Sequence, residues 1–289
     1  MKYYALYNPI AGNGEGEARA KALENTISGE IVYLNITELS YPELFEKLNS
    51  DDVIIICGGD GTLNRFVNDT EEFEISNDIW YYALGTGNDF LKDVGKEVGC
   101  DAFSVKEYIC DLPTVEVKGK TYRFLNNVGF GIDGYCCEVG DEMKKASPKP
   151  VNYTAIAIKG LLFHYKPTNA TIVVDGKEYK YKKVWLAPTM NGRFYGGGMM
   201  ATPDQNRLDP EKKLSVMLFH GKGKLKTLIT FPSIFKGEHV KKDYMVAIHT
   251  GREISVTFDQ PRAVQIDGET ILGVTGYTAH ASVTANVAK

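Results

Sequence analysis

Three short segments in the first hundred residues combine glycine with Asn, Asp or Thr, as loops that bind phosphate do. They read NPIAG at 8–12, GGDGTLN at 58–64 and LGTGNDF at 84–90. Backbone N–H groups bind a phosphate at close range, and glycine permits this approach because it has no side chain. Asp60 adds a carboxylate, which would repel an anionic ligand unless a cation or a transferable proton lies between them. The second segment therefore predicts a nucleotide bound with Mg²⁺, and an ordinary Gly-Asp-Gly turn is the alternative.

The glycine spacing differs from that of two widespread phosphate-binding motifs. The chain has no G-x-x-x-x-G-K-[ST] sequence. Gly12, Gly14 and Gly16 lack the spacing of the dinucleotide-binding fingerprint. We therefore expect these loops to bind phosphate in another way.

A predicted β-strand comes directly before each of the three segments. The expected strands are Lys2–Leu6, Val53–Cys57 and Trp80–Leu84, with a fourth at Ile31–Leu34 and helices over 15–27 and 40–48. The third strand along the chain is apolar at every position, as in a central strand covered on both faces. In an open parallel sheet, ligands bind outside the carboxyl ends of the strands. The first third of the chain therefore predicts an α/β domain with its site at that edge.

After about Pro113 the sequence changes to closely spaced β-type runs. The expected strands are Thr114–Val117, Tyr122–Val128, Thr171–Val174, Lys183–Pro188, Lys213–Phe219, Tyr244–Thr250, Glu253–Phe258 and Ala263–Ile266, with one helix over 153–163. Such a series predicts an antiparallel sandwich or barrel. We therefore expect an α/β domain over 1–113 and a β-sandwich domain over 114–275. A C-terminal segment over 276–289 would return to the first domain through the β-type run Ala281–Val287.

The composition limits the class of protein. Of the 289 residues 43% are apolar, which excludes a disordered chain, and the net charge of −4 argues against a nucleic-acid binder. The five cysteines form no C-x-x-C pair and the five histidines show no ligand spacing, which argues against a disulfide framework or a zinc site. No segment is typical of a membrane span or a cleaved leader, so we expect a cytoplasmic protein.

The three glycine segments, in this order, resemble the N-terminal motifs of the diacylglycerol kinase catalytic-domain family. This family includes soluble bacterial diacylglycerol kinases and sphingosine kinases. Asn126–Gly131, Tyr195–Met199 and Gln265–Glu269 resemble its C-terminal motifs, so the likeness spans nearly the whole chain. It implies a nucleotide-binding α/β domain similar to that of NAD kinases, followed by an antiparallel β-sandwich domain, with ATP in the cleft between them.

The resemblance also assigns residues by motif. Asp60 and Asp89 would belong to a water and Mg²⁺ network near the triphosphate. The Asp267-Gly268-Glu269 segment would hold the base that accepts the proton of the lipid hydroxyl. We favour Glu269 with Asp267 beside it, although the sequence leaves open which of them acts, and an ordinary hairpin turn is the alternative. The expected nucleotide contacts are Asn8, Pro9, Ile10, Ala11, Gly12, Thr37, Gly58, Gly59, Asp60, Gly61, Thr62, Leu63, Asn64, Arg65, Thr86, Gly87, Asn88 and Asp89.

Members of this family hold a structural Mg²⁺ in a loop after the triple-glycine motif, which is 196–198 in this chain. Here Asp209 can stand for the family's aspartate, and Asn206 and Glu211 can supply carbonyl oxygens. Pro210 takes the place of the family's glycine, and the loop is slightly longer. We therefore expect a metal at these three residues only if the loop tolerates both changes.

The resemblance implies an ATP- and Mg²⁺-dependent lipid kinase that phosphorylates a lipid alcohol, with diacylglycerol as the favoured acceptor. The substrate would lie at a membrane surface, which the local basic runs Lys222–Lys226 and Lys236–Lys242 could approach. An NAD kinase-like enzyme and a nucleotide-binding regulatory protein without kinase activity are the alternatives. The oligomeric state, a homodimer included, is left open.

Overall fold

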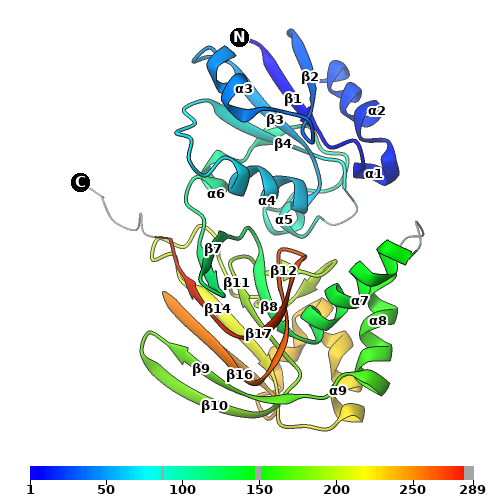
Figure 1. Ribbon diagram of the computed structural model, residues 1–289, viewed down its shortest axis with the longest axis vertical. Coiled ribbons are helices and arrows are strands. Elements are labelled where there is room, and N and C mark those ends of the chain that lie inside the picture. The colour runs from blue at the N-terminus through cyan, green and yellow to red at the C-terminus, as the bar shows by residue number, and fades with distance from the viewer. Residues whose placement is uncertain (86–87, 147–150, 283–289) are drawn as a thin grey trace. The chain divides into compact units, whose positions relative to one another are not determined.

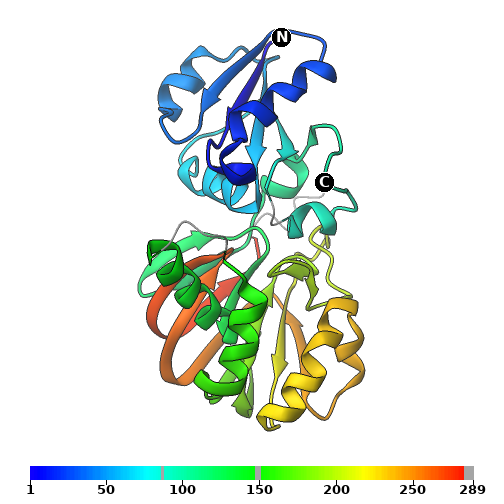
Figure 2. The same ribbon diagram turned by 90° about the vertical axis from the view of Figure 1, so that its right-hand side faces the viewer.

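The computed structural model describes residues 1–85, 88–146 and 151–282. The chain forms two compact units, Met1–Asp111 and Leu112–Lys289 (Figures 1 and 2). Within the described ranges, no helix combines the length and the apolar content needed to cross a bilayer.

The first unit is built on a five-stranded sheet with the order β2-β1-β3-β4-β5. Its strands are β1 (Tyr3–Tyr7), β2 (Ile31–Asn35), β3 (Val53–Gly58), β4 (Asp78–Ala83) and β5 (Phe103–Ser104). The first four pair in parallel, and β5 runs antiparallel to β4. Every residue of β3 is buried, which confirms the prediction of a covered central strand. The loops after β3 and β4 are therefore neighbours at the carboxyl edge of the sheet.

Helices connect these strands (Figure 1). They are α1 (Ala11–Gly14), α2 (Gly16–Ala20), η1 (Lys21–Asn25), α3 (Tyr41–Lys47), α4 (Asp60–Asp69), α5 (Asp89–Asp93) and α6 (Lys106–Ile109). The single helix predicted over 15–27 is wrong in detail, because this stretch divides into α2 and a 3-10 helix, η1. Positive φ angles of 59° at Gly12 and 64° at Asn13 also interrupt the short segment α1.

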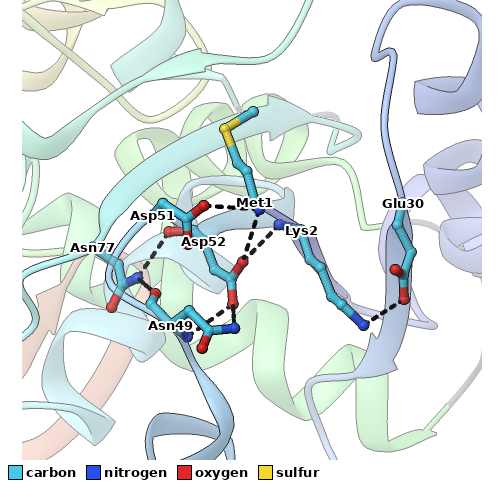
Figure 3. A network of polar contacts seen from close by, with 7 residues as sticks. All are labelled: Met1, Lys2, Glu30, Asn49, Asp51, Asp52 and Asn77. Carbon is cyan, nitrogen blue, oxygen red and sulfur yellow. Dashed lines mark hydrogen bonds and ion pairs between the residues drawn. The ribbon is translucent and has the colours of Figure 1, made fainter.

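A polar network closes the amino edge of the same sheet, opposite the glycine loops (Figure 3). The buried Asp52 accepts hydrogen bonds from the backbone N–H groups of Lys2, at 2.6 Å, and Asn49, at 2.8 Å. These donors lower the pKa of Asp52. The Asn77 amide donates to the carbonyl oxygens of Asn49 and Asp52, at 2.8 Å each. The network ties the starts of β1, β3 and β4 together and leaves their carboxyl ends for the site.

The second unit contains a ten-stranded antiparallel sheet, which confirms the predicted β-sandwich class. Its strands are β6 (Thr114–Val117), β7 (Lys120–Arg123), β8 (Asn127–Gly131), β9 (Thr168–Val174), β10 (Lys177–Val184), β11 (Leu186–Met190), β14 (Leu214–Phe219), β15 (Val246–Gly251), β16 (Glu253–Ile266) and β17 (Glu269–His280). A separate hairpin joins β12 (Phe194–Tyr195) to β13 (Met199–Met200). The core includes Phe130 stacked on Phe258, with ring centroids 4.1 Å apart.

Several elements of this unit differ from the sequence predictions. The two short strands expected at Glu253–Phe258 and Ala263–Ile266 are one strand, β16, with register shifts between its pairs to β17. The run predicted over 122–128 is broken between β7 and β8. Residues 276–280, expected in the segment that returns to the first domain, lie in β17, and residues 283–289 are outside the described ranges.

Most helices of this unit were not predicted from the sequence. The predicted helix appears as α8 (Tyr153–Lys159) and a π-helical turn, η2 (Gly160–His164). The structure adds α7 (Ile132–Ala146), α9 (Lys224–Thr230), η3 (Phe231–Lys236) and η4 (Glu238–Lys241). Two glycines weaken the helical pattern of α7, but Gly134 is needed for packing, because a Cβ there would lie 2.0 Å from the Ala263 carbonyl oxygen on β16.

Candidate active site

The loops that follow β1, β3 and β4 are hydrogen-bonded to one another. Asn8 N donates to the Cys57 carbonyl at 3.0 Å, and its side-chain amide donates to the Thr62 hydroxyl at 3.0 Å. Leu84 N donates to the Gly58 carbonyl at 2.8 Å. The structure therefore brings the three sequence-predicted segments together, as far as the described residues extend, at the carboxyl edge of the first-unit sheet.

Close contacts explain one glycine within these loops, Gly58, and one just after the first loop, Gly16. A Cβ at Gly58 would lie 2.4 Å from the Thr62 hydroxyl oxygen, and one at Gly16 would lie 1.9 Å from the Asn8 carbonyl oxygen. Gly61 differs, because no atom lies within 4 Å of a Cβ built there. Gly61 is in the first turn of α4, where helix N–H groups face outward and favour an anion. This arrangement fits a phosphate group close to the start of α4.

Two carboxylates begin the helices that follow β3 and β4. Asp60 begins α4, and its Oδ2 accepts a hydrogen bond from Phe90 N at 2.9 Å. Burial and, next, the charge of Asp60 raise the pKa of the neighbouring Tyr81 hydroxyl far above its usual value. Asp89, 8% exposed, begins α5. Among the described residues, no three or more His, Cys, Asp and Glu are grouped so that they could hold a metal ion by themselves. Mg²⁺ in phosphoryl-transfer sites, however, needs only one or two carboxylates besides the nucleotide phosphates. The residues present therefore fit Mg²⁺-ATP.

The other predicted nucleotide contacts differ in how much of each side chain is available. The Leu63 side chain is fully buried, so only its backbone is available to a ligand, whereas Ile10 is 77% exposed. Arg65 pairs with Asp69, with 3.1 Å between Nε and Oδ2. The side chain of Asn64 accepts a hydrogen bond from the Asn68 amide at 3.1 Å.

Further predicted contacts lie at the same edge of the sheet. Thr37 follows β2, is exposed and donates its hydroxyl to Asn35 Oδ1 at 2.8 Å. The Asn88 side-chain amide donates to the Gly85 carbonyl at 2.8 Å. Thr86 and Gly87, also predicted to contact nucleotide, lie outside the described residues.

The Asp267-Gly268 pair forms the tight turn between β16 and β17. Both residues have positive φ, 46° and 96°, as a two-residue hairpin turn requires. The Asp267 carboxylate accepts hydrogen bonds from the backbone N–H groups of Leu125, Asn126 and Asn127, the last two at 2.8 and 3.0 Å. Burial nevertheless raises the pKa of Asp267 to about 6, against the effect of these donors. The turn is thus fixed to the residues just before β8.

The neighbouring carboxylate of Glu269 lies in a different environment. Glu269 is exposed and pairs in register with Ile266. Gly268 N, between the two acidic residues, donates to the Gln265 side-chain oxygen at 2.7 Å. The segment therefore presents one partly buried carboxyl with a raised pKa, Asp267, and one exposed carboxylate, Glu269.

A third carboxyl lies near this turn and was not predicted from the sequence. It belongs to Asp133, in the first turn of α7. A Cβ at Gly129 would lie 1.9 Å from Asp133 Oδ2 and 2.5 Å from Gln265 Nε2, so the two side chains converge over that glycine. Burial raises the pKa of Asp133 to about 7. The available signal was Gly129, four positions before Asp133, which leaves the space that both side chains occupy.

The loop predicted to hold a structural metal uses its oxygen atoms internally. Asp209 accepts hydrogen bonds from Glu211 N at 3.1 Å and from Lys213 N at 3.3 Å. The Asn206 carbonyl accepts from Asp209 N at 2.9 Å. The Glu211 carboxylate pairs with Lys213, and its carbonyl accepts from the Arg252 guanidinium. These oxygen atoms are therefore already hydrogen-bonded or ion-paired, so the geometry of the described loop does not favour a metal ion.

Comparisons with known proteins cover both units. The model of the diacylglycerol kinase catalytic domain matches residues 2–117. The model of the YegS C-terminal NAD kinase beta sandwich-like domain matches residues 126–285.

Individual relatives and solved structures agree with these matches. YtlR of Bacillus subtilis (strain 168), named as a candidate lipid kinase, is 25% identical over 95% of this chain and 95% of its own length. A diacylglycerol kinase of Mycobacterium tuberculosis (strain ATCC 25618 / H37Rv) is 26% identical over 84% of this chain and 81% of its own length. A crystal structure of a candidate diacylglycerol kinase from Bacillus anthracis str. Sterne shares the fold, with a TM-score of 0.66, 18% identity and coverage of 97% and 91% of the two chains.

The family matches confirm the resemblance drawn from the six motifs. Membership implies the use of ATP and of a lipid substrate. The chain is therefore a lipid kinase that belongs to the diacylglycerol kinase catalytic-domain family and carries a YegS-type C-terminal domain.

Proposed function

We propose that this lipid kinase transfers the γ-phosphate of Mg²⁺-ATP to the hydroxyl of diacylglycerol and forms phosphatidic acid. The observation that carries the proposal is the hydrogen-bonded set of loops after β1, β3 and β4, with Asp60 at the start of α4. Diacylglycerol is proposed as the acceptor because the Mycobacterium tuberculosis relative is a diacylglycerol kinase.

The loops of the first unit would hold the nucleotide mainly through backbone groups. The first-turn N–H groups of α4 would face the phosphates, and Gly61 would let them approach. Asp60 and Asp89 would hold Mg²⁺, directly or through water, and when bound it neutralises charge that develops on the phosphate oxygens. Asp60 is held in place for this role by Phe90 N.

We favour Asp267 over Glu269 as the base, which reverses the preference drawn from the sequence. A general base works best when its pKa lies near the operating pH, and burial moves the pKa of Asp267 to about 6. At neutral pH Asp267 is therefore ionised but more basic than an ordinary carboxylate. Three backbone donors fix its orientation, whereas Glu269 is exposed. Asp267 would accept the proton of the lipid hydroxyl as the oxygen attacks the γ-phosphorus.

The test is a transfer assay with ATP labelled on its γ-phosphate. Diacylglycerol, a sphingoid base, a prenol and phosphatidylglycerol are each offered to the full-length chain in detergent micelles, and NAD is offered in solution. Labelled phosphatidic acid is the expected product. Label in another lipid would replace the proposed acceptor, and label in NADP would favour the NAD kinase-like alternative. Tight ATP binding without transfer to any of them would favour a regulatory protein.

A further inference from the structure

The surface around α9 in the second unit exposes large apolar side chains close together. Leu225 and Ile229 are 71% and 69% exposed and lie one helical turn apart, so they share a face of α9. A shallow hollow beside them is lined by Lys224, Leu225, Lys226, Ile229, Lys242 and Tyr244. Apolar side chains scattered singly on a surface are ordinary, but a contiguous group marks an interaction site. We call these six residues the α9 surface.

A second exposed aromatic side chain extends this surface. Phe163, in η2, is 72% exposed. Lys224 Nζ donates to the carbonyl oxygen of the preceding residue, Leu162, at 2.9 Å, so η2 lies against the start of α9. Figure 1 likewise shows α9 beside the helix formed by α8 and η2. The apolar side chains therefore come from two adjacent helical segments.

The charge of this region is opposite to that of the whole chain. The segment 222–244 contains six lysines against Glu238 and Asp243, a net charge of +4, whereas the full chain carries −4. Two of the lysines lie over Tyr244, with 4.5 Å from Lys226 Nζ and 5.5 Å from Lys222 Nζ to the ring centroid. Ammonium groups and exposed apolar side chains therefore occur together on this surface.

Cations around apolar side chains match the chemistry of an anionic bilayer surface. Leucine, isoleucine and phenylalanine side chains gain free energy when they leave water for the acyl-chain boundary. The lysines are attracted to anionic headgroups, and their long stems let them reach the headgroups while the apolar groups insert. An apolar protein partner would not require the lysines beside these side chains.

We propose that the α9 surface docks the enzyme on a bilayer that contains anionic phospholipid. The inference deepens the proposed function and rests on it in one respect, because a lipid alcohol acceptor is presented by a membrane. The basic run 222–226, which was connected with a membrane surface from the sequence alone, supplies three of the six residues, Lys224, Leu225 and Lys226.

Vesicle co-sedimentation of the full-length chain tests this docking surface. Vesicles of phosphatidylcholine alone are compared with vesicles that also contain phosphatidylglycerol, without ATP and without any alcohol acceptor. We expect binding only to the anionic vesicles, weakened by added salt. Leu225→Glu with Ile229→Glu should lower the apparent affinity about tenfold or more, because two apolar side chains no longer insert.

Matched variants separate docking from general effects. Lys224→Ser with Lys226→Ser should weaken binding most at low salt. Val98→Glu, which changes a 69% exposed apolar residue of the first unit, should bind as the wild type does. All of these positions are exposed, so melting temperatures should stay close to that of the wild type. Equal binding of the Leu225/Ile229 variant and the wild type would overturn the proposal.

Two further outcomes would also overturn it. Equal binding of the wild type to both kinds of vesicle would remove the role of the lysines. A dimer that dissociates in the Leu225/Ile229 variant, with no vesicle binding by the wild type, would assign the surface to a second copy of the chain. Because binding is measured without ATP or acceptor, failure of the proposed transfer reaction leaves this result interpretable. Transfer to an acceptor in detergent micelles should be unchanged in the α9 variants.

Discussion

At the residue scale, Asp267 and Glu269 stand two positions apart in environments that assign them different chemistry. Asp267 is fixed by three backbone donors and has its pKa raised by burial, whereas Glu269 is exposed. The motif identified both residues from the sequence. Their different burial depends on the loop before β8, which no local pattern around the turn could indicate.

Replacement of each carboxyl separates their roles. Asp267→Asn should lower the rate of phosphoryl transfer by about 10²- to 10⁴-fold, the usual contribution of a general base. Glu269→Gln should lower it by much less. Initial rates with saturating ATP and lipid check this, with thermal melting to show that Asp267→Asn folds. A larger loss of transfer rate in Glu269→Gln than in Asp267→Asn would identify Glu269 as the base.

The wild-type pH profile gives an independent check that needs no variant. The base must be ionised to accept a proton, so transfer should fall as the pH is lowered through about 6, the pKa to which burial raises Asp267. The measurement is the initial rate between pH 5 and pH 8, at ATP and lipid concentrations that remain saturating. A rate that stays constant down to pH 5 would contradict the role of Asp267.

Asp133 predicts a pH dependence of stability rather than of activity. Its pKa is about 7 in the folded chain and near 4 in an unfolded one, so the folded state holds the proton to higher pH. The free energy of unfolding that depends on Asp133 therefore decreases as the pH rises from about 4 to about 7. Asp133→Asn removes this dependence. Between pH 5 and pH 8 the variant should gain about 2 to 3 kcal/mol relative to the wild type in urea unfolding. The same difference at both pH values would contradict the burial of an ionisable group here.

At the scale of elements, the strand-loop-helix unit β3-α4 was predictable because its signals are local. An entirely apolar run, a glycine pair and a helical pattern follow one another directly within 53–69. Helix α7 was not predictable in this way. Gly134 and Gly140 lower its intrinsic helix propensity, and both allow close packing, against the β16 backbone and the Tyr153 ring respectively.

Gly61 provides a direct test of the phosphate loop. Alanine should be tolerated in the fold and should stabilise α4 by about 0.5 to 1 kcal/mol, because its Cβ meets no atom within 4 Å. The same methyl group should weaken ATP binding, because a phosphate can no longer approach the first turn of α4. Calorimetric titration with ATP and thermal melting measure the two effects. Gly223→Ala is the control, because Gly223 is the N-cap of α9, lies outside the phosphate loops and likewise has open space around a Cβ. Unchanged ATP affinity in Gly61→Ala would contradict the loop assignment.

We predict that the loop over 206–213 is stable without a bound metal ion. Asp209 and the neighbouring carbonyl groups are bonded to backbone N–H groups, and Arg252 and Lys213 supply the positive charge. The melting temperature without nucleotide should therefore be the same in EDTA and in Mg²⁺, whereas Arg252→Ala should lower it. A lower melting temperature in EDTA would contradict this prediction and would support the structural metal that the family resemblance implies.

At the scale of the whole molecule, sequence and structure agree on two units of different class. The α/β unit and the antiparallel β unit were predictable because alternating strand and helix patterns give way to closely spaced β-type runs near Pro113. The pairing of strands that are far apart in the sequence was not predictable. The contact between β16 and β8 joins residues more than a hundred positions apart, and such pairs are set by burial rather than by local propensity.

The most direct test of the account is the rate of phosphatidic acid formation from diacylglycerol and Mg²⁺-ATP by the wild type and by Asp60→Ala. Asp60→Asn, which keeps an oxygen acceptor for Phe90 N, serves as a second variant if Asp60→Ala is unstable. The account predicts steady phosphatidic acid formation by the wild type and its loss in a folded Asp60 variant. Wild-type turnover in a folded Asp60 variant, or no phosphatidic acid from the wild type, would contradict it.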